Sequence, residues 1–174
     1  MSDHSQPDAR AKLIKAAVLT VSDKGAAGER SDESGDALEE ALSTMGVPLV
    51  RRAIVPDEFD QIAERLRFWA DETDVNLILT TGGTGFTSRD ITPEATLAVL
   101  DRLATGFAEA MRAGSLQKTP HAMLSRAVSG LRGKTLIVNM PGSPRACREQ
   151  FEMIAAALPH GIEKLLDQGG DCAT

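Results

Sequence analysis

The residues best suited to chemistry follow a short apolar run in the middle of the chain. The segment Asn76–Thr96, NLILTTGGTGFTSRDITPEAT, passes from a strand-like run into three glycines within four residues. Glycines tolerate positive φ, so successive backbone N–H groups can converge on one point, and the N-terminus of the following helix adds partial positive charge. This combination favours a phosphate group, although a tight turn is the alternative. The residues of this predicted anion-binding loop are Gly82, Gly83, Thr84 and Gly85.

A polar segment, Ser88, Arg89 and Asp90, follows soon after the glycines. Arginine neutralises oxyanions and aspartate is a ligand for Mg²⁺, so beside a phosphate loop both are candidates for nucleotide chemistry. The alternative is an exposed ion pair without function. We expect Ser88 to lie with the ligand-binding residues of the loop.

Polar residues also follow the first two predicted strands. Ser22 and Asp23 come after the first strand and are either turn formers or part of a ligand-binding rim. Asp57 comes after the second strand and before an amphipathic helix, so it is either the N-cap of that helix or a carboxylate on the ligand side. In open parallel sheets, ligands bind beyond the carboxyl ends of the strands, so we expect these residues and the glycine loop to meet at one edge.

The last predicted strand ends in a turn of the same kind, with the sequence NMPGSP. Its Pro-Gly pair predicts a tight turn, and the serine after it predicts a helix N-cap. Four strand ends therefore offer polar or Gly-rich loops to one edge of the sheet, which indicates a site more strongly than any single loop does. The candidate ligand-binding residues of this turn are Asn139, Pro141, Gly142 and Ser143.

Familiar phosphate-binding motifs do not fit. The GKT at Gly133–Thr135 has Val128 in place of the first glycine of a Walker A loop, and it leads into a strand. Gly83 and Gly85 begin a dinucleotide-binding pattern, but Ser88 stands where the third glycine is required. The three histidines are scattered and the two cysteines form no CxxC pair, so we expect free thiols and no histidine-based metal cluster.

Alternating strands and helices position these loops. Apolar runs predict strands over Ala16–Val21, Val47–Val55 and Val75–Thr80, and two more strands joined by a Gly-containing turn within 122–144. Residues 22–35 are expected to form a loop. Helices are expected at 36–45, 56–72, Thr92–Leu103 and Phe107–Leu116, and from Ser143 to a break at Pro159. The first is ended by Gly46, and the second has Phe59, Ile62, Leu66 and Trp69 on its apolar face. The third is expected to have Thr92 as N-cap and Pro93 as first residue.

This alternation predicts an α/β fold, a three-layer sandwich with a mainly parallel sheet, an antiparallel edge and helices on both faces. The 174 residues suit a single domain, expected over 13–168, between a disordered N-terminal tail at 1–12 and a C-terminal tail at 169–174. The net charge of −6 argues against broad nucleic-acid binding. No apolar run approaches the roughly 20 residues of a membrane span, so no membrane contact and a cytoplasmic location are expected.

Four segments, taken together, resemble one known family. The strings VLTVSD, TTGGTGFTSRDITPEAT, LSRAV and NMPGSP, in this order and spacing, are similar to the MogA/MoaB-type domain of molybdenum cofactor biosynthesis, which also forms the G domain of gephyrin. The resemblance extends over about residues 15–166. It is carried mainly by the long string from the glycines to TPEAT, because VSD alone would be weak.

The resemblance implies a molybdopterin adenylyltransferase, a nucleotidyltransferase that converts MgATP and molybdopterin into adenylylated molybdopterin and pyrophosphate. Asp57 and Asp90 match residues implicated in catalysis, and we expect both to bind Mg²⁺. The glycine loop matches the part that holds the nucleotide phosphates, and Asn139–Ser143 matches a second nucleotide-contacting turn. The family further implies a homotrimer, with hexamers among MoaB-like members, and transfer of the product to a separate molybdate-insertion enzyme.

Two other functions remain open at this point. One is a non-catalytic trimeric module that binds molybdopterin or acts as a scaffold, as the gephyrin connection allows. The other is a nucleotide pyrophosphatase, which would release AMP without a pterin. Arg89 and Asp90 beside the loop favour the adenylyltransferase.

Overall fold

The computed structural model describes residues 8–168, which form one sheet covered by helices on both faces. The six strands lie in the order β2-β1-β3-β6-β5-β4. The first four of these are parallel to one another, and β5 and β4 are antiparallel to their neighbours. The strands are β1 (Ala16–Val21), β2 (Leu49–Val55), β3 (Leu77–Thr81), β4 (Arg102–Leu103), β5 (Ser129–Arg132) and β6 (Thr135–Met140).

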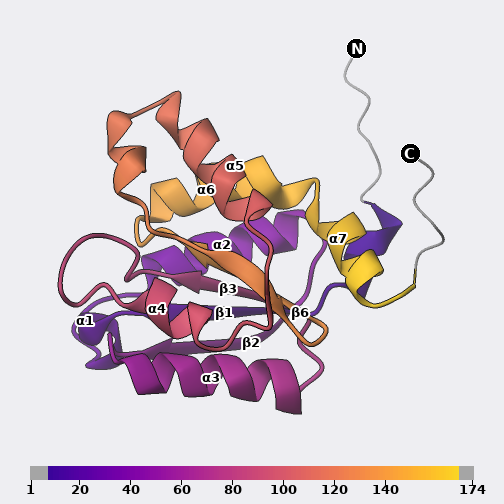
Figure 1. The fold of residues 1–174 in the computed structure, drawn as a ribbon, viewed down its shortest axis with the longest axis horizontal. Coiled ribbons are helices and arrows are strands. Elements are labelled where there is room, and N and C mark those ends of the chain that lie inside the picture. Colours follow the sequence, from indigo (N-terminus) through magenta and orange to yellow (C-terminus); the bar gives the residue numbers. More distant parts are fainter. Residues whose placement is uncertain (1–7, 169–174) are drawn as a thin grey trace.

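The helices divide between the two faces (Figure 1). One face is covered by α2, α5, α6 and α7, and the other by α3 and α4. The α-helices are α1 (Asp23–Ala26), α2 (Glu33–Thr44), α3 (Phe59–Glu72), α4 (Thr92–Leu97), α5 (Gly106–Leu116), α6 (Pro144–Ala155) and α7 (Leu158–Leu165), and the 3-10 helices are η1 (Ala9–Leu13) and η2 (Pro120–Leu124). No helix within residues 8–168 is both long and apolar enough to cross a membrane.

Two separate cores arise because successive strand side chains point to opposite faces. In β1, Val18 packs on the α2 side whereas Leu19 packs on the α3 side, and both are fully buried. In β3, Leu79 and Ile78 divide in the same way. Burial on both faces explains why these strands are continuous apolar runs rather than alternating ones. The predicted three-layer fold is therefore confirmed, antiparallel edge included.

Two predicted boundaries are wrong around α4. The helix expected over 92–103 ends at Leu97, because Arg102–Leu103 forms β4 and pairs with β5. Its N-cap is Ile91 instead of Thr92, whose hydroxyl donates to the carbonyl oxygen of Gly82 at 2.9 Å. In both places a long-range hydrogen bond overrides the local preference.

Other differences have local causes. A single helical turn, α1, lies within the predicted loop 22–35 because the Ser22 side chain caps it by accepting from Gly25 N. Within the tail predicted over 1–12, residues from Ala9 onward belong to η1, which Asp8 caps, and Ala11 is buried. Residues 1–7 and 169–174 lie outside the described residues. Phe59 was expected in the core, yet it is 40% exposed at the first position of α3.

The predicted break in the last helix, near Pro159, is confirmed. Proline is disfavoured within a helix but tolerated in the first turn of a new one. Accordingly α6 ends at Ala155, and α7 begins at Leu158. The Gly-containing turn that was predicted between the last two strands is confirmed. It links β5 to β6 and contains Gly133 at φ 51°.

Candidate active site

The carboxyl ends of β2, β1, β3 and β6 meet at one edge of the sheet, at the left in Figure 1. The turns that follow these strands line a cavity of about 240 Å³. Its lining includes Ser22, Asp57, Gly82, Gly83 and Gly142, so residues from all four strand ends contribute. The chain leaves β1 toward β2 on one side and later adds β3 on the other, so the cavity lies at the topological switch point where open α/β sheets bind ligands.

The glycine loop adopts a conformation that side chains would prevent. Gly82 has φ 95° and Gly83 has φ 64°. A Cβ on Gly82 would lie 2.3 Å from the carbonyl oxygen of Val21, and a Cβ on Gly83 would lie 2.3 Å from Thr92 Oγ1. Thr92 also donates its backbone N–H to Gly83 O at 3.1 Å, so this N–H of the first turn of α4 is not available to a ligand.

The main-chain N–H groups of residues 82–86 donate no hydrogen bond within the described part of the chain. Backbone donors that lack partners are costly unless solvent or a ligand accepts from them. The Pro141–Ser143 turn lies directly beside this loop, because a Cβ on Gly142 would be 3.4 Å from the Gly82 Cα. The arrangement therefore suits an anion with several acceptor oxygens, such as a phosphate.

Asp23 and Asp57 join the ends of β1 and β2 by reciprocal hydrogen bonds. Asp23 N donates to Asp57 Oδ2 at 2.8 Å, and Asp57 N donates to Asp23 Oδ1 at 2.9 Å. Arg89 reaches back from the loop after β3 and donates to both carboxylate oxygens of Asp23, and to Glu58 Oε1 at 2.9 Å. These contacts fix three of the turns relative to one another and neutralise Arg89.

Asp57 is a cavity residue and not a helix cap. The N-cap of α3 is Glu58, whereas one oxygen of Asp57 accepts from Asp23 N and the other faces Gly83, whose Cβ would lie 3.3 Å from Asp57 Oδ1. Burial raises the pKa of the Asp57 carboxyl; the hydrogen bond from Asp23 and the charge of Arg89 oppose this shift, and the negative charges of Asp23 and Asp90 add to it. From the sequence, Asp57 could be either a helix N-cap or a carboxylate on the ligand side. The structure places its carboxyl group beside the glycine loop.

Asp90 lies beside the same loop, near Gly85. Its Oδ2 accepts from Thr87 N at 2.8 Å, and a Cβ on Gly85 would lie 3.0 Å from this oxygen. The residues between 8 and 168 provide no hydrogen-bond partner for Asp90 Oδ1. Within the same residues no group of three or more His, Cys, Asp and Glu side chains could hold a metal. Two carboxylates beside a phosphate loop match Mg²⁺, which takes one or two protein carboxylates and completes its shell with water and phosphate oxygens.

Some predicted ligand residues have other roles. Asn139 is fully buried: its Nδ2 donates to Thr80 Oγ1 and Thr96 Oγ1, and its Oδ1 accepts from Val128 N. The Asn139 side chain thus connects β6 to β3 and α4 and does not reach the cavity. The Ser143 side chain caps α6, and Ser88 is exposed on the outer part of the loop.

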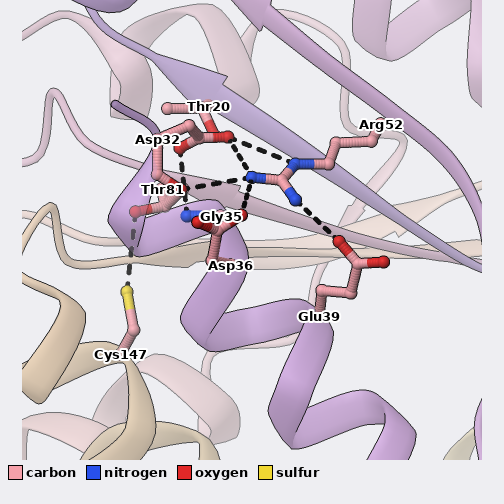
Figure 2. Close-up of polar contacts among 8 residues, drawn as sticks. All are labelled: Thr20, Asp32, Gly35, Asp36, Glu39, Arg52, Thr81 and Cys147. Atoms are coloured by element: carbon pink, nitrogen blue, oxygen red, sulfur yellow. Dashed lines mark hydrogen bonds and ion pairs between the residues drawn. The ribbon is translucent and has the colours of Figure 1, made fainter. Parts of the chain in front are cut away.

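Sequence reasoning missed Asp32, which also lines the cavity. Figure 2 shows the polar contacts of its side chain. This carboxylate accepts from Thr20 Oγ1 at 2.8 Å, and from Gly35 N at 3.0 Å as the N-cap of α2. Arg52 on β2 donates to Asp32 Oδ2 at 2.7 Å and also binds Asp36 and Glu39. The available signal was an Asp three residues before Gly35 at the start of an amphipathic helix, which is a capping pattern.

A second cavity, of about 230 Å³, lies on the other side of the glycine loop. Thr84 and Pro141 contribute to its lining, together with Lys118, His121 and Ser125 from the region around η2. Sequence analysis gave these last three no individual role. Lys118 and His121 belong to no recognised motif, and Ser125 belongs to LSRAV, which served only for the family resemblance. All three come near the loop only through the tertiary fold.

Comparisons with known proteins identify relatives of this chain. Residues 17–160 match the family described as "Probable molybdopterin binding domain". A molybdopterin adenylyltransferase of Helicobacter pylori (strain J99) is 43% identical over 157 residues, which cover 89% of this chain and 89% of that protein. Gephyrin of Dictyostelium discoideum is 40% identical over 155 residues, which cover 83% of this chain and 21% of gephyrin. The crystal structure of the molybdopterin biosynthesis enzyme MoaB from Thermus thermophilus aligns with a TM-score of 0.84 and 47% identity, over 88% of this chain and 97% of that one.

Replacement of Asn139 tests its structural role. Asn139→Ala removes three buried side-chain hydrogen bonds and leaves their partners unsatisfied, so we expect the free energy of unfolding to fall by about 2–4 kcal/mol. Urea unfolding measures this loss. At a temperature where the variant stays folded, its affinity for ATP should equal that of the wild type. A variant of normal stability with weakened ATP binding would contradict the assignment.

Replacement of Asp57 should affect stability through its pKa. The folded-state pKa lies above the ordinary value of 3.8, so this carboxyl's contribution to stability decreases as pH rises from 3.8 through the raised value. Asp57→Asn removes the ionisation, and the amide oxygen can still accept from Asp23 N. We therefore expect the variant to be at least as stable as the wild type at neutral pH. Urea unfolding at several pH values, followed by fluorescence of the single tryptophan, Trp69, measures this.

Asp23→Asn is the matched control, with the opposite sign. The hydrogen bonds from Arg89 hold the pKa of Asp23 below 3.8, so its stabilising contribution is present above 3.8 and is lost as pH falls through the lowered pKa. This variant should be less stable than the wild type at neutral pH, and the difference should disappear in acid. A destabilised Asp57→Asn alongside an unchanged Asp23→Asn would show that the two environments are assigned wrongly.

Proposed function

The chain belongs to the molybdopterin-binding domain family of molybdenum cofactor biosynthesis, and we propose that it is a molybdopterin adenylyltransferase. In this reaction a terminal phosphate oxygen of molybdopterin attacks the α-phosphorus of ATP. A new P–O bond forms, the bond to the bridging oxygen of the β-phosphate breaks, and pyrophosphate leaves. The observation that carries the proposal is the cavity at the switch point together with the glycine loop beside it. The loop's main-chain N–H groups have no partner within residues 8–168, and the loop lies against the carboxylates of Asp57 and Asp90.

The glycine loop supplies the site for the ATP phosphates. Its N–H groups are fixed before the substrate arrives, because Gly82 and Gly83 are held by Thr92. Preorganised donors stabilise charge on phosphate oxygens without the cost of reorganisation during the reaction. Since this kind of transfer requires mainly positioning and charge neutralisation, such a loop provides much of what the reaction needs.

Asp57, beside Gly83, and Asp90, beside Gly85, are the residues that would hold a magnesium ion. Mg²⁺ bound there would neutralise negative charge on the phosphates. Burial raises the pKa of Asp57 in the free protein, and a cation bound there would favour the ionised form of this carboxyl. Arg89 contributes indirectly by fixing the β1 and β2 turns through Asp23 and Glu58.

No protein nucleophile is required for this reaction, and the described residues agree with that. Cys147 is the free thiol among residues 8–168, and burial raises its pKa to about 11. Its Sγ donates to Pro141 O at 2.9 Å, so it supports the turn after β6. A thiol held protonated in this way is a poor nucleophile.

The second cavity offers a place for the pterin. It adjoins the glycine loop through Thr84 and Pro141, so a ligand there would lie beside the nucleotide site. Lys118 provides a cation, which pairs with Glu149 of the same lining at 3.2 Å. Thr119, Ser125 and Gln150 provide hydrogen-bonding groups for a polar heterocycle and its phosphate. A pterin phosphate bound there and the α-phosphate of ATP would then both lie beside the loop.

The principal test mixes the purified chain with molybdopterin, ATP and Mg²⁺, and measures both pyrophosphate and adenylylated molybdopterin. We expect the two products in equal amounts. Asp90→Asn should lower turnover by at least about 100-fold, equivalent to ~3 kcal/mol, while folding is preserved because the amide oxygen can accept from Thr87 N.

Asp101→Asn is the matched control, because Asp101 also accepts one backbone N–H, from Gly133, but on the turn between β5 and β6. It should retain normal turnover. Release of AMP from ATP without a pterin would indicate a pyrophosphatase instead. Binding of molybdopterin without any pyrophosphate would indicate a scaffold, and either result would overturn the proposal.

We also propose that the chain works as a homotrimer in the cytoplasm and passes its product to a separate molybdate-insertion enzyme. Large apolar side chains on the surface support self-association, since Phe86 is 68% and Met123 is 66% exposed.

Light scattering tests the trimer. The expected mass is three times the chain mass of 18.5 kDa, unchanged on dilution through the concentrations used for the activity assay. A mass of 18.5 kDa in an active preparation would contradict a trimer.

A further inference from the structure

The glycine loop needs external support. Glycine-rich segments lose more conformational entropy on ordering than other segments, so an isolated loop of this sequence would not hold its N–H groups in one arrangement. Thr92 holds only its first half, through Gly82 O and Gly83 O. The Arg89 side chain ties the second half to the β1 and β2 turns. The main chain from Thr84 to Asp90 requires another anchor.

Arg126 provides that anchor from the connection between η2 and β5. Its backbone N–H donates to Thr84 O at 3.0 Å, and its Nε donates to Gly85 O at 2.7 Å. Its Nη2 donates to Asp90 O, and its Nη1 pairs with the carboxylate of Glu94 on α4. One residue therefore binds both ends of the Gly85–Asp90 segment and the helix that follows it.

These contacts determine which way the loop's N–H groups point. In a trans peptide the carbonyl and the N–H of the same unit point in opposite directions. Thr92 and Arg126 together hold the four consecutive carbonyls of residues 82–85. The N–H groups of residues 83–86 are consequently turned away from these two anchors, and they have no partner within the described chain.

We propose that Arg126 is a positioning residue for the adenylyl transfer, which acts through the main chain of the loop by fixing the N–H groups of Gly85 and Phe86 and the backbone of Asp90. This inference rests on the proposed function for its kinetic part only. A guanidinium is required because its planar fork carries donors in several directions, whereas a lysine ammonium is a single point charge that cannot span Gly85 O, Asp90 O and Glu94.

The test compares Arg126→Ala and Arg126→Lys with the wild type. Both variants should lower kcat for pyrophosphate release by about 10–100-fold, the usual cost of a small misplacement, and should change the KM for ATP much less. The Arg126 side chain is 32% exposed, so added guanidinium at non-denaturing concentration should reach the vacated position and restore part of the turnover of Arg126→Ala. Full turnover in Arg126→Lys, or no rescue together with unchanged kcat in Arg126→Ala, would overturn the proposal.

Hydrogen exchange gives a second measurement that does not depend on activity. The amides of Thr87, Asp90 and Thr92 donate hydrogen bonds within or to the loop, so they should exchange faster in Arg126→Ala than in the wild type, and added guanidinium should slow them again. The matched control is Arg132→Ala, because Arg132 likewise binds a carboxylate, Asp71, and a backbone carbonyl, Val99 O, but lies beside the turn between β5 and β6. The control should leave turnover and loop exchange unchanged.

The two proposals can fail separately. If the wild type makes no adenylylated molybdopterin, the proposed function is wrong, and loop exchange alone decides the role of Arg126. Faster exchange confined to Arg126→Ala would still support the anchor. Equal exchange in the wild type, Arg126→Ala and Arg132→Ala would overturn it, whatever the enzyme does.

Discussion

The close approach of β3 to β1 at the carboxyl edge of the sheet is the constraint on which the site depends. Parallel pairing brings Gly82 against the Val21 carbonyl, where a Cβ would lie 2.3 Å from the oxygen. Because only glycine fits, the chain can turn there with positive φ and continue along the sheet edge. The loop then lies beside Asp57 on one side and the Pro141–Ser143 turn on the other. The cavity is therefore a consequence of strand order combined with one position that excludes a side chain.

The site attracts anions without a basic surface. The chain carries a net charge of −6, and the two arginines beside the glycine loop are already paired: Arg89 with Asp23 and Glu58, Arg126 with Glu94. Arg30 is exposed, lines the cavity and has no ion pair within residues 8–168. What remains for a phosphate is a row of main-chain N–H dipoles and this one arginine, to which a bound cation would add. Such donors act only at short range and in one orientation, whereas exposed lysines attract any polyanion. This explains how an acidic protein can bind a nucleotide while it offers little to a nucleic-acid backbone.

Much of the fold and part of the site could be predicted from the sequence. Strands buried on both faces appear as continuous apolar runs, and GGTG after β3 has few conformational alternatives, so the sheet, the loop and the residues beside it were found. Asn139 was misplaced because a turn motif does not reveal on which face of the strand its first residue lies. Thr92 and Asp32 were misassigned or missed because their roles depend on partners far away in sequence, Gly82 for the first and Arg52 for the second. Local propensity predicts elements; it does not predict which long-range contact will override it.

The anchoring of the loop connects the two halves of the sheet. Thr92 is local, as it lies in the helix that follows the loop, but Arg126 is 41 residues from Gly85 in sequence and belongs to the antiparallel edge. The N–H groups that would bind phosphate can therefore be ordered only after the segment leading into β5 has packed against the loop. The β4–β5 edge, which supplies none of the strand ends lining the nucleotide cavity, is in this sense part of the active site. A fold that contained only the four parallel strands would form the turns but would leave the main chain in the second half of the glycine loop without the Arg126 anchor.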